Sequence, residues 1–143
     1  MILAEYIALL DEKRILLRKI IGNTESQIRL IRQQKMVGIK RLLRARRQLL
    51  AELAELAELA ELVQREAAGL CWNERDDVQD IRRQIQQAEQ QLLVANSLAV
   101  QLALKEQKRI AGQMRGNSQA REIHQTYIGR WYQGVSRGFS RKV

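Results

Sequence analysis

Residues 78–102 read VQDIRRQIQQAEQQLLVANSLAVQL, and this stretch decides the fold. Apolar side chains recur in it at alternating spacings of three and four residues, the heptad pattern of a helix that buries one stripe. The eight positions of the pattern, all apolar, are Val78, Ile81, Ile85, Ala88, Leu92, Ala95, Ala99 and Leu102. We therefore predict a long amphipathic helix over about 76–113.

The same alternation, with interruptions, runs through the first sixty residues. Gly22, Asn23 and Thr24 stand inside it, and glycine can end a helix while Asn or Thr can cap the next one. We therefore predict two helices here, at about 2–21 and 25–66. One long bent helix remains an alternative, because the apolar phase carries through this point without a skip.

Residues 51–62 read AELAELAELAEL, a repeat of three. Each repeat advances a helix by about 300°, so the leucines drift by about 60° per unit and cannot all face one partner. We interpret this segment as a helical spacer, with a functional acidic patch as the alternative. A turn is predicted after it, at about 67–75, where Cys71 is a small buried or half-buried side chain and Trp72 covers the apolar end of the bundle.

Three helices joined by short turns must run up, down and up. The predicted fold class is all-α: an antiparallel three-helix bundle whose second and third helices form an elongated coiled-coil hairpin, followed by a flexible C-terminal tail. We assign residues 1–117 to the helical bundle. Residues 118–143 form the tail, in which glycines, basic residues and aromatic residues replace the helical pattern.

The residues that chemistry requires are scarce. One cysteine and one histidine, His124, cannot form an intrachain disulfide or a four-ligand metal site, and we expect no cofactor. Asp76, Asp77 and Asp80 cluster where a helix begins and favour its macrodipole, so we do not predict an enzyme. We recognise no signal peptide and no apolar stretch of about 18 residues, so we expect a cytoplasmic protein without membrane insertion.

The net charge of +9 is unevenly distributed. Residues 38–50 contain five Lys or Arg and no acidic residue, whereas residues 51–80 contain nine acidic residues and two arginines. The rod should therefore have one acidic and one basic end. The basic run forms a cationic patch of Lys40, Arg41, Arg44, Arg46 and Arg47. A solvated helix face explains this patch; nucleic-acid binding, with the aromatic tail as a stacking surface, is a disfavoured alternative.

The last seventeen residues, YIGRWYQGVSRGFSRKV from Tyr127, contain four of the six aromatic residues. Tyr and Trp beside Arg are the residue types that dominate interface hot spots. This segment resembles the C-terminal signature of the FlgN-like flagellar export chaperones. Asn96, Trp72 and the run SQIRLIRQQK at 26–35 also fall where that family has such features. A tail that folds back over the bundle is the alternative.

The resemblance implies a cytoplasmic chaperone that binds the C-terminal helical regions of hook-filament junction (hook-associated) proteins and delivers them to the type III export gate. Tyr127 matches the family tyrosine that docks on the export-gate membrane protein. The residues that the resemblance assigns to the gate are Tyr127, Gly129, Trp131 and Tyr132.

The basic balance and the Ala-Glu-Leu repeat depart from that family, so the client-binding face remains open. We favour the less regular first half of the chain for the client. The identity of the client and the oligomeric state also remain open. A coiled-coil stalk or escort protein of a secretion ATPase is the main alternative function, because it too would be a basic, proline-free helical hairpin.

Overall fold

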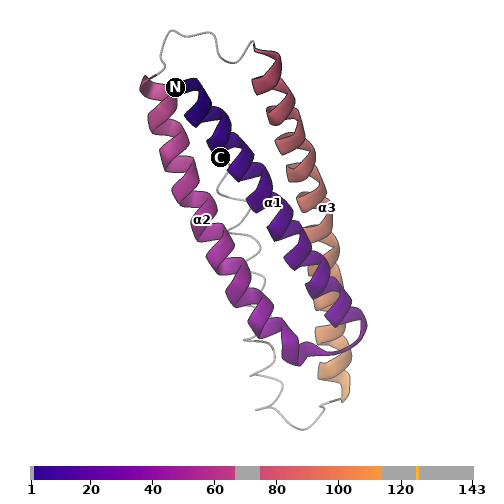
Figure 1. Ribbon diagram of the computed structural model, residues 1–143. Coiled ribbons are helices and arrows are strands. Elements are labelled where there is room, and N and C mark those ends of the chain that lie inside the picture. The colour runs from indigo at the N-terminus through magenta and orange to yellow at the C-terminus, as the bar shows by residue number, and fades with distance from the viewer. Residues whose placement is uncertain (1, 67–74, 114–124, 126–143) are drawn as a thin grey trace.

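The computed structural model describes residues 2–66, 75–113 and 125. It contains α1 (Ile2–Arg32), a short 3-10 helix η1 (Met36–Gly38), α2 (Ile39–Glu66) and α3 (Asp76–Gln113). The described residues contain no strand. Figure 1 shows α1 and α3 running in one direction and α2 in the other. The predicted all-α, three-helix bundle is confirmed.

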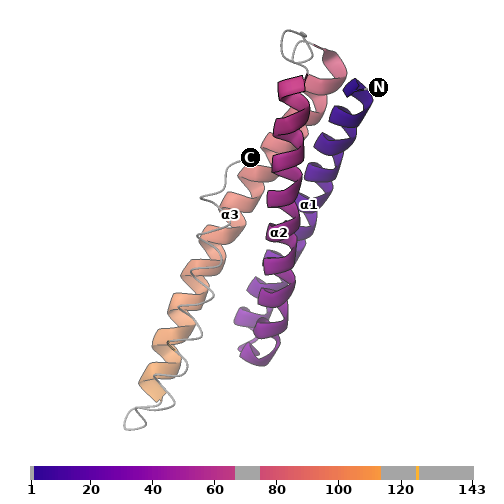
Figure 2. The same cartoon turned by 90° about the vertical axis from the view of Figure 1, so that its left-hand side faces the viewer.

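The central helix of the bundle is α1, which packs closely along both α2 and α3. At its C-terminal end α3 continues beyond the connection between α1 and α2 (Figures 1 and 2). We expected α2 and α3 to form the elongated hairpin, but the main neighbour of α3 is α1 and not α2. The cause is the length of α1, which has 31 residues and spans most of the bundle.

The predicted helix break near residue 23 is wrong, because α1 continues to Arg32. Gly22 is exposed, and a methyl group built on it would meet no atom within 4 Å. Asn23 and Thr24 are buried, and the Asn23 side-chain amide donates to the backbone oxygen of Leu42 at 2.9 Å. These polar residues serve contacts between helices and not a helix cap.

The chain reverses at Gln34 instead, whose φ of 58° places it in the left-handed region. Lys35 N donates to the Leu30 oxygen at 2.9 Å, and Gln34 N donates to the Ile31 oxygen at 3.0 Å. This pair of bonds is the Schellman motif that closes a helix. Glycine usually occupies the left-handed position, and a glutamine there leaves little sign of it in the sequence.

Gly22→Ala should stabilise the chain by about 0.5–1 kcal/mol, because alanine has the higher helix propensity and space is free at this position. Chemical denaturation followed by circular dichroism measures the change. Gly38→Ala is a matched control with a smaller gain, because its methyl group would lie 2.8 Å from Leu30 Cδ1 and push that side chain away. A loss of stability in Gly22→Ala would contradict a continuous α1.

The heptad stripe of α3 is confirmed, since all eight predicted positions are buried or half-buried. The stripe also changes register along the helix. From Ala88 the most buried positions step by four residues to Leu92 and by four again to Asn96, and then follow Ala99 and Ala103. Two steps of four keep the stripe close to the natural period of a straight helix, so α3 shifts its contact line by one residue.

Two apolar clusters form the core. The larger one contains Ile20 of α1, Leu53 of α2 and Ile85 of α3. The smaller one contains Ile31 and Ala99, together with three further residues and their neighbours. On each helix, buried polar side chains lie in the sequence between the residues of the larger cluster and those of the smaller cluster.

The Ala-Glu-Leu repeat contributes unequally to this core. Leu53 and Leu56 are buried, whereas Leu59 and Leu62 are 52% and 54% exposed. The predicted drift of the leucines around the helix explains this sequence of burial.

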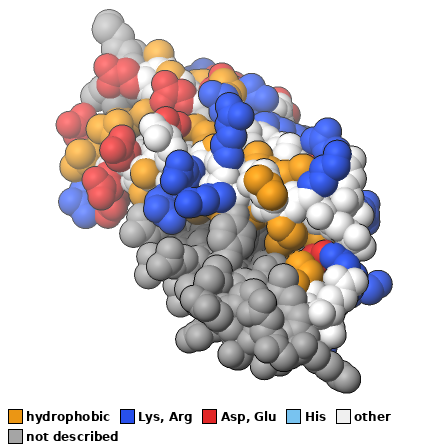
Figure 3. All heavy atoms as spheres, turned by 90° about the horizontal axis from the view of Figure 1, so that it is seen from below, with side chains coloured by type: hydrophobic (Ala, Val, Ile, Leu, Met, Phe, Trp, Pro, Cys, Tyr) orange, Lys and Arg blue, Asp and Glu red, His pale blue; other side chains and the backbone are white. Residues whose placement is uncertain are grey.

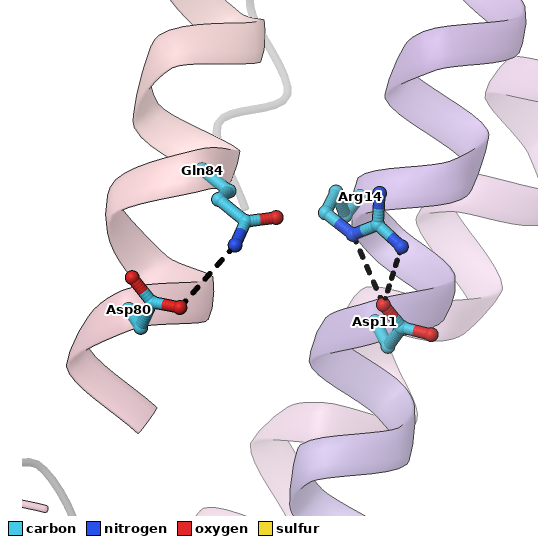
Figure 4. Close-up of polar contacts among 4 residues, drawn as sticks. All are labelled: Asp11, Arg14, Asp80 and Gln84. Atoms are coloured by element: carbon cyan, nitrogen blue, oxygen red, sulfur yellow. Dashed lines mark hydrogen bonds and ion pairs between the residues drawn. The ribbon is translucent and has the colours of Figure 1, made fainter. Parts of the chain in front are cut away.

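Several charged surface residues form contacts within single helices (Figure 4), while Lys13 Nζ pairs with Glu89 Oε1 at 3.6 Å between α1 and α3. Arg14 Nη2 donates to Asp11 Oδ1 at 2.8 Å within α1, and Gln84 Nε2 donates to Asp80 Oδ2 at 3.4 Å within α3. Arg14 and Gln84 extend toward one another across the space between the two helices. Such pairs stabilise a helix by only about 0.2–0.5 kcal/mol each, so the core determines how the helices assemble.

Candidate docking groove between α1 and α3

A groove with a volume of about 860 Å³ lies between α1 and α3, and we call it the α1/α3 groove. Its wall on α1 consists of Ile21, Glu25, Ile28, Arg29, Arg32 and Gln33. Its wall on α3 consists of Gln90, Gln91, Val94, Ala95 and Leu98. The groove is large enough for several side chains of a binding partner.

The α3 wall presents apolar side chains that the bundle does not cover. Val94 is 70% exposed and Leu98 is 36% exposed, and these two residues are one helical turn apart. Ile28 lines the opposite wall and is itself 8% exposed. An amphipathic helix binds such a groove through anchors at spacings of three, four and seven residues.

The rim of the groove is basic on the α1 side. Arg29 and Arg32 are exposed in the last turns of α1, and Arg29 Nη2 donates to Ser26 Oγ at 3.1 Å. None of the ion pairs among the described residues involves either arginine. Glu25 is the acidic residue of the lining, and Gln90 and Gln91 on the α3 wall are neutral. The rim therefore favours a partner with acidic flanks.

Buried polar side chains alternate in sequence with the groove residues on α1 and α3, and a buried residue of α2 joins them. We call this group the polar layer. Its members are Asn23, Thr24, Gln27, Arg46 and Asn96. Arg46 Nη1 donates to Thr24 Oγ1 at 2.6 Å, and Arg46 Nη2 donates to Asn96 Oδ1 at 3.1 Å. Thr24, Arg46 and Asn96 belong to α1, α2 and α3 respectively, so these hydrogen bonds connect all three helices.

Arg46 is 1% exposed, and burial lowers its pKa to about 10, so it remains charged at neutral pH. No ion pair of Arg46 with a carboxylate occurs among the described residues. Arg46 Nε and Asn96 Nδ2 have no hydrogen-bond partner in the described part of the chain. We interpret this incompletely satisfied layer as a device that fixes the register of the helices and not as a source of stability.

The predicted cationic patch is wrong in one residue. Arg46 lies seven residues after Ile39 and seven before Leu53, and both of those residues are buried core positions. That spacing directs Arg46 into the bundle. Lys40, Arg41, Arg44 and Arg47 are exposed on α2.

The residues assigned to the export gate, Tyr127, Gly129, Trp131 and Tyr132, lie outside the described residues, as do Cys71, Trp72, His124 and all of the predicted turn at 67–75 except Arg75. The run at 26–35 supplies Arg29 and Arg32 of the rim. Val94 and Leu98 were not predicted from the sequence as binding residues. Both residues are apolar but lie outside the heptad stripe, and a helix that buries one face does not need apolar residues there. This excess of apolar residues could have indicated a binding surface.

Comparison with protein-family models, with curated proteins and with solved structures finds no match to this chain. Among the described residues, no group of three or more His, Cys, Asp or Glu side chains could hold a metal ion. No described helix combines the length and the apolar character needed to cross a membrane. The α1/α3 groove is therefore the feature on which we base a function.

Proposed function

We propose that this chain is a flagellar type III export chaperone that holds a C-terminal helix of a hook-filament junction protein in the α1/α3 groove. The observation that carries the proposal is the exposure of Val94 and Leu98 between two helices. The resemblance of residues 127–143 to the FlgN-like chaperones supplies the class of client and the export gate as the destination. The chaperone acts in the cytoplasm, without a cofactor.

The physical basis is the exchange of exposed apolar surface. A junction-protein helix that has not yet assembled exposes an apolar stripe, which would otherwise promote aggregation. The groove offers the exposed Val94 and Leu98 as contacts for that stripe, and the buried Ile21 and Ile28 also line it. Docking adds a fourth helix locally and removes apolar surface of both partners from water, with a gain of about 25 cal/mol per Å² before the costs of association.

The stalk of a secretion ATPase is supported less well. That function requires a two-helix hairpin, whereas here α1 packs along both α2 and α3. Nucleic-acid binding also loses support, because Arg46 is buried and leaves four exposed basic residues at the patch.

Co-purification distinguishes these functions. The tagged full-length chain, expressed in its native host, should retain a hook-filament junction protein, identified by mass spectrometry. Retention of the secretion ATPase without a junction protein would favour the stalk function and contradict ours. In a mobility-shift assay we expect no retardation of nucleic acid even at low salt, where electrostatic binding is strongest.

Tyr127→Ala, or deletion of 127–143, should weaken binding to the cytoplasmic domain of the export-gate protein by about tenfold or more, as loss of a hot-spot aromatic does. Helicity and client binding should change little, because the groove residues lie on α1 and α3. Surface plasmon resonance with the purified gate domain measures the first effect and circular dichroism the second. Equal gate affinity of the full-length and truncated chains would contradict this assignment.

A further inference from the structure

The outward face of α2 has a symmetric charge pattern. One stripe of this face contains Lys40, Arg44, Arg47, Ala51, Glu55, Glu58 and Leu62, and we call it the α2 charge stripe. Successive members are three or four residues apart, so all lie on one side of the helix. Six of the seven are charged or alanine, all seven are exposed, and the stripe is basic before Ala51 and acidic after it.

The pattern is complementary to itself in reverse. In an antiparallel pair of identical helices centred on Ala51, Arg44 lies opposite Glu58 of the second copy and Arg47 lies opposite Glu55. Lys40 then lies opposite Leu62, which is 54% exposed and can be covered by the aliphatic stem of the lysine. The small side chain of Ala51 at the centre permits a close approach of the two helices.

We propose that the α2 charge stripe binds a second copy of this chain, with the two α2 helices antiparallel around a two-fold axis at Ala51. A two-fold interface repeats each contact, so the two types of ion pair occur twice. Each such exposed pair contributes little alone, but four around a shared apolar centre give a dimer that salt weakens.

A second copy fits this face better than nucleic acid does. Glu55 and Glu58 continue the same stripe and would repel phosphate groups, whereas they attract the basic half of a second copy. Figure 3 shows acidic side chains gathered at one edge of the molecule and basic side chains over other parts of the described surface. The α1/α3 groove contains no residue of α2, so a dimer would leave both grooves available for clients.

Sedimentation velocity of the full-length chain over a concentration series at low salt tests the proposal. The wild type should shift from monomer to dimer, and high salt should reverse the shift. Arg44→Glu/Arg47→Glu and, separately, Glu55→Arg/Glu58→Arg should each weaken self-association by about tenfold or more, because like charges then meet. Circular dichroism serves as the control for folding.

The two variants together provide the decisive arm. Apart from Lys40, all charged residues of the stripe are acidic in the first variant, and all are basic in the second, so an equal mixture should form a heterodimer. The chain with all four substitutions should again form a homodimer. A wild type that remains monomeric at low salt, or a mixture that shows no association, would overturn the proposal. Neither result would bear on client binding in the groove.

Discussion

Asn96→Leu should lower the free energy of unfolding by about 2–4 kcal/mol, although leucine has nearly the same size as asparagine. The substitution removes Asn96 Oδ1, which accepts a hydrogen bond from Arg46 Nη2 at 3.1 Å. Arg46 would then retain Thr24 as its hydrogen-bond partner on α1, while its charge stays buried at 1% exposure. Urea denaturation followed by circular dichroism measures the loss.

The origin of this loss can be tested by removing the charge itself. Arg46→Met in the Asn96→Leu background should recover most of the lost stability, because no buried guanidinium then lacks partners. Adding Thr24→Val, which leaves Asn23 and Gln27 as the polar members of the layer, should give a chain as stable as the wild type or more stable. Single and double variants form a cycle that isolates the coupling between Arg46 and Asn96. Additive losses without any recovery would contradict our interpretation of the polar layer.

Val94→Asp should weaken binding of the junction-protein helix by about thirtyfold or more, equivalent to about 2 kcal/mol. A carboxylate in the α1/α3 groove must lose water when the client docks, and it meets the apolar stripe of the client. Stability should change little because Val94 is 70% exposed. Isothermal titration calorimetry with the C-terminal segment of the junction protein measures the affinity.

Leu93→Asp is the matched control for that substitution. Leu93 is the preceding residue of α3, is 50% exposed and does not line the groove. Its replacement introduces the same charge on the same helix but should leave client affinity within about twofold, as for a residue outside the hot spot. Equal effects of the two substitutions would show that the groove does not select the client.

The fold was predictable where periodicity alone determines it. The stripe from Val78 to Leu102 fixed a long helix and its buried face, because a pattern of threes and fours has few other solutions. The start of α3 at Asp76 was also predictable from its acidic first turn. Both features depend on the order of residues along a single helix.

The end of α1 was not predictable, because its signals depend on other parts of the chain. Asn23 and Thr24 have the composition of a helix cap, but their partners are Leu42 and Arg46 of α2. The actual end uses Gln34 in the left-handed region without a glycine. Local sequence therefore suggested a break where tertiary contacts maintain a helix.

The candidate site was predictable only in part. The seven-residue spacing of Ile39, Arg46 and Leu53 could have indicated that Arg46 is buried. Because Arg46 is one of five basic residues between residues 38 and 50, however, the local sequence suggested a surface patch. Val94 and Leu98 could have been identified as apolar residues outside the heptad. That they form a groove with α1 depends on the pairing of α3 with α1, whereas the sequence pattern predicted that α3 pairs with α2.

The most direct test of client binding is methyl nuclear magnetic resonance of the full-length chain during titration with the junction-protein C-terminal segment. We expect saturable shifts of the Val94 and Leu98 methyl signals, because these side chains line the α1/α3 groove. The exposed Leu59 and Leu62 of α2 serve as internal references and should not change. An excess of the segment that leaves Val94 and Leu98 unshifted, or that shifts only the α2 leucines, would contradict the proposed function.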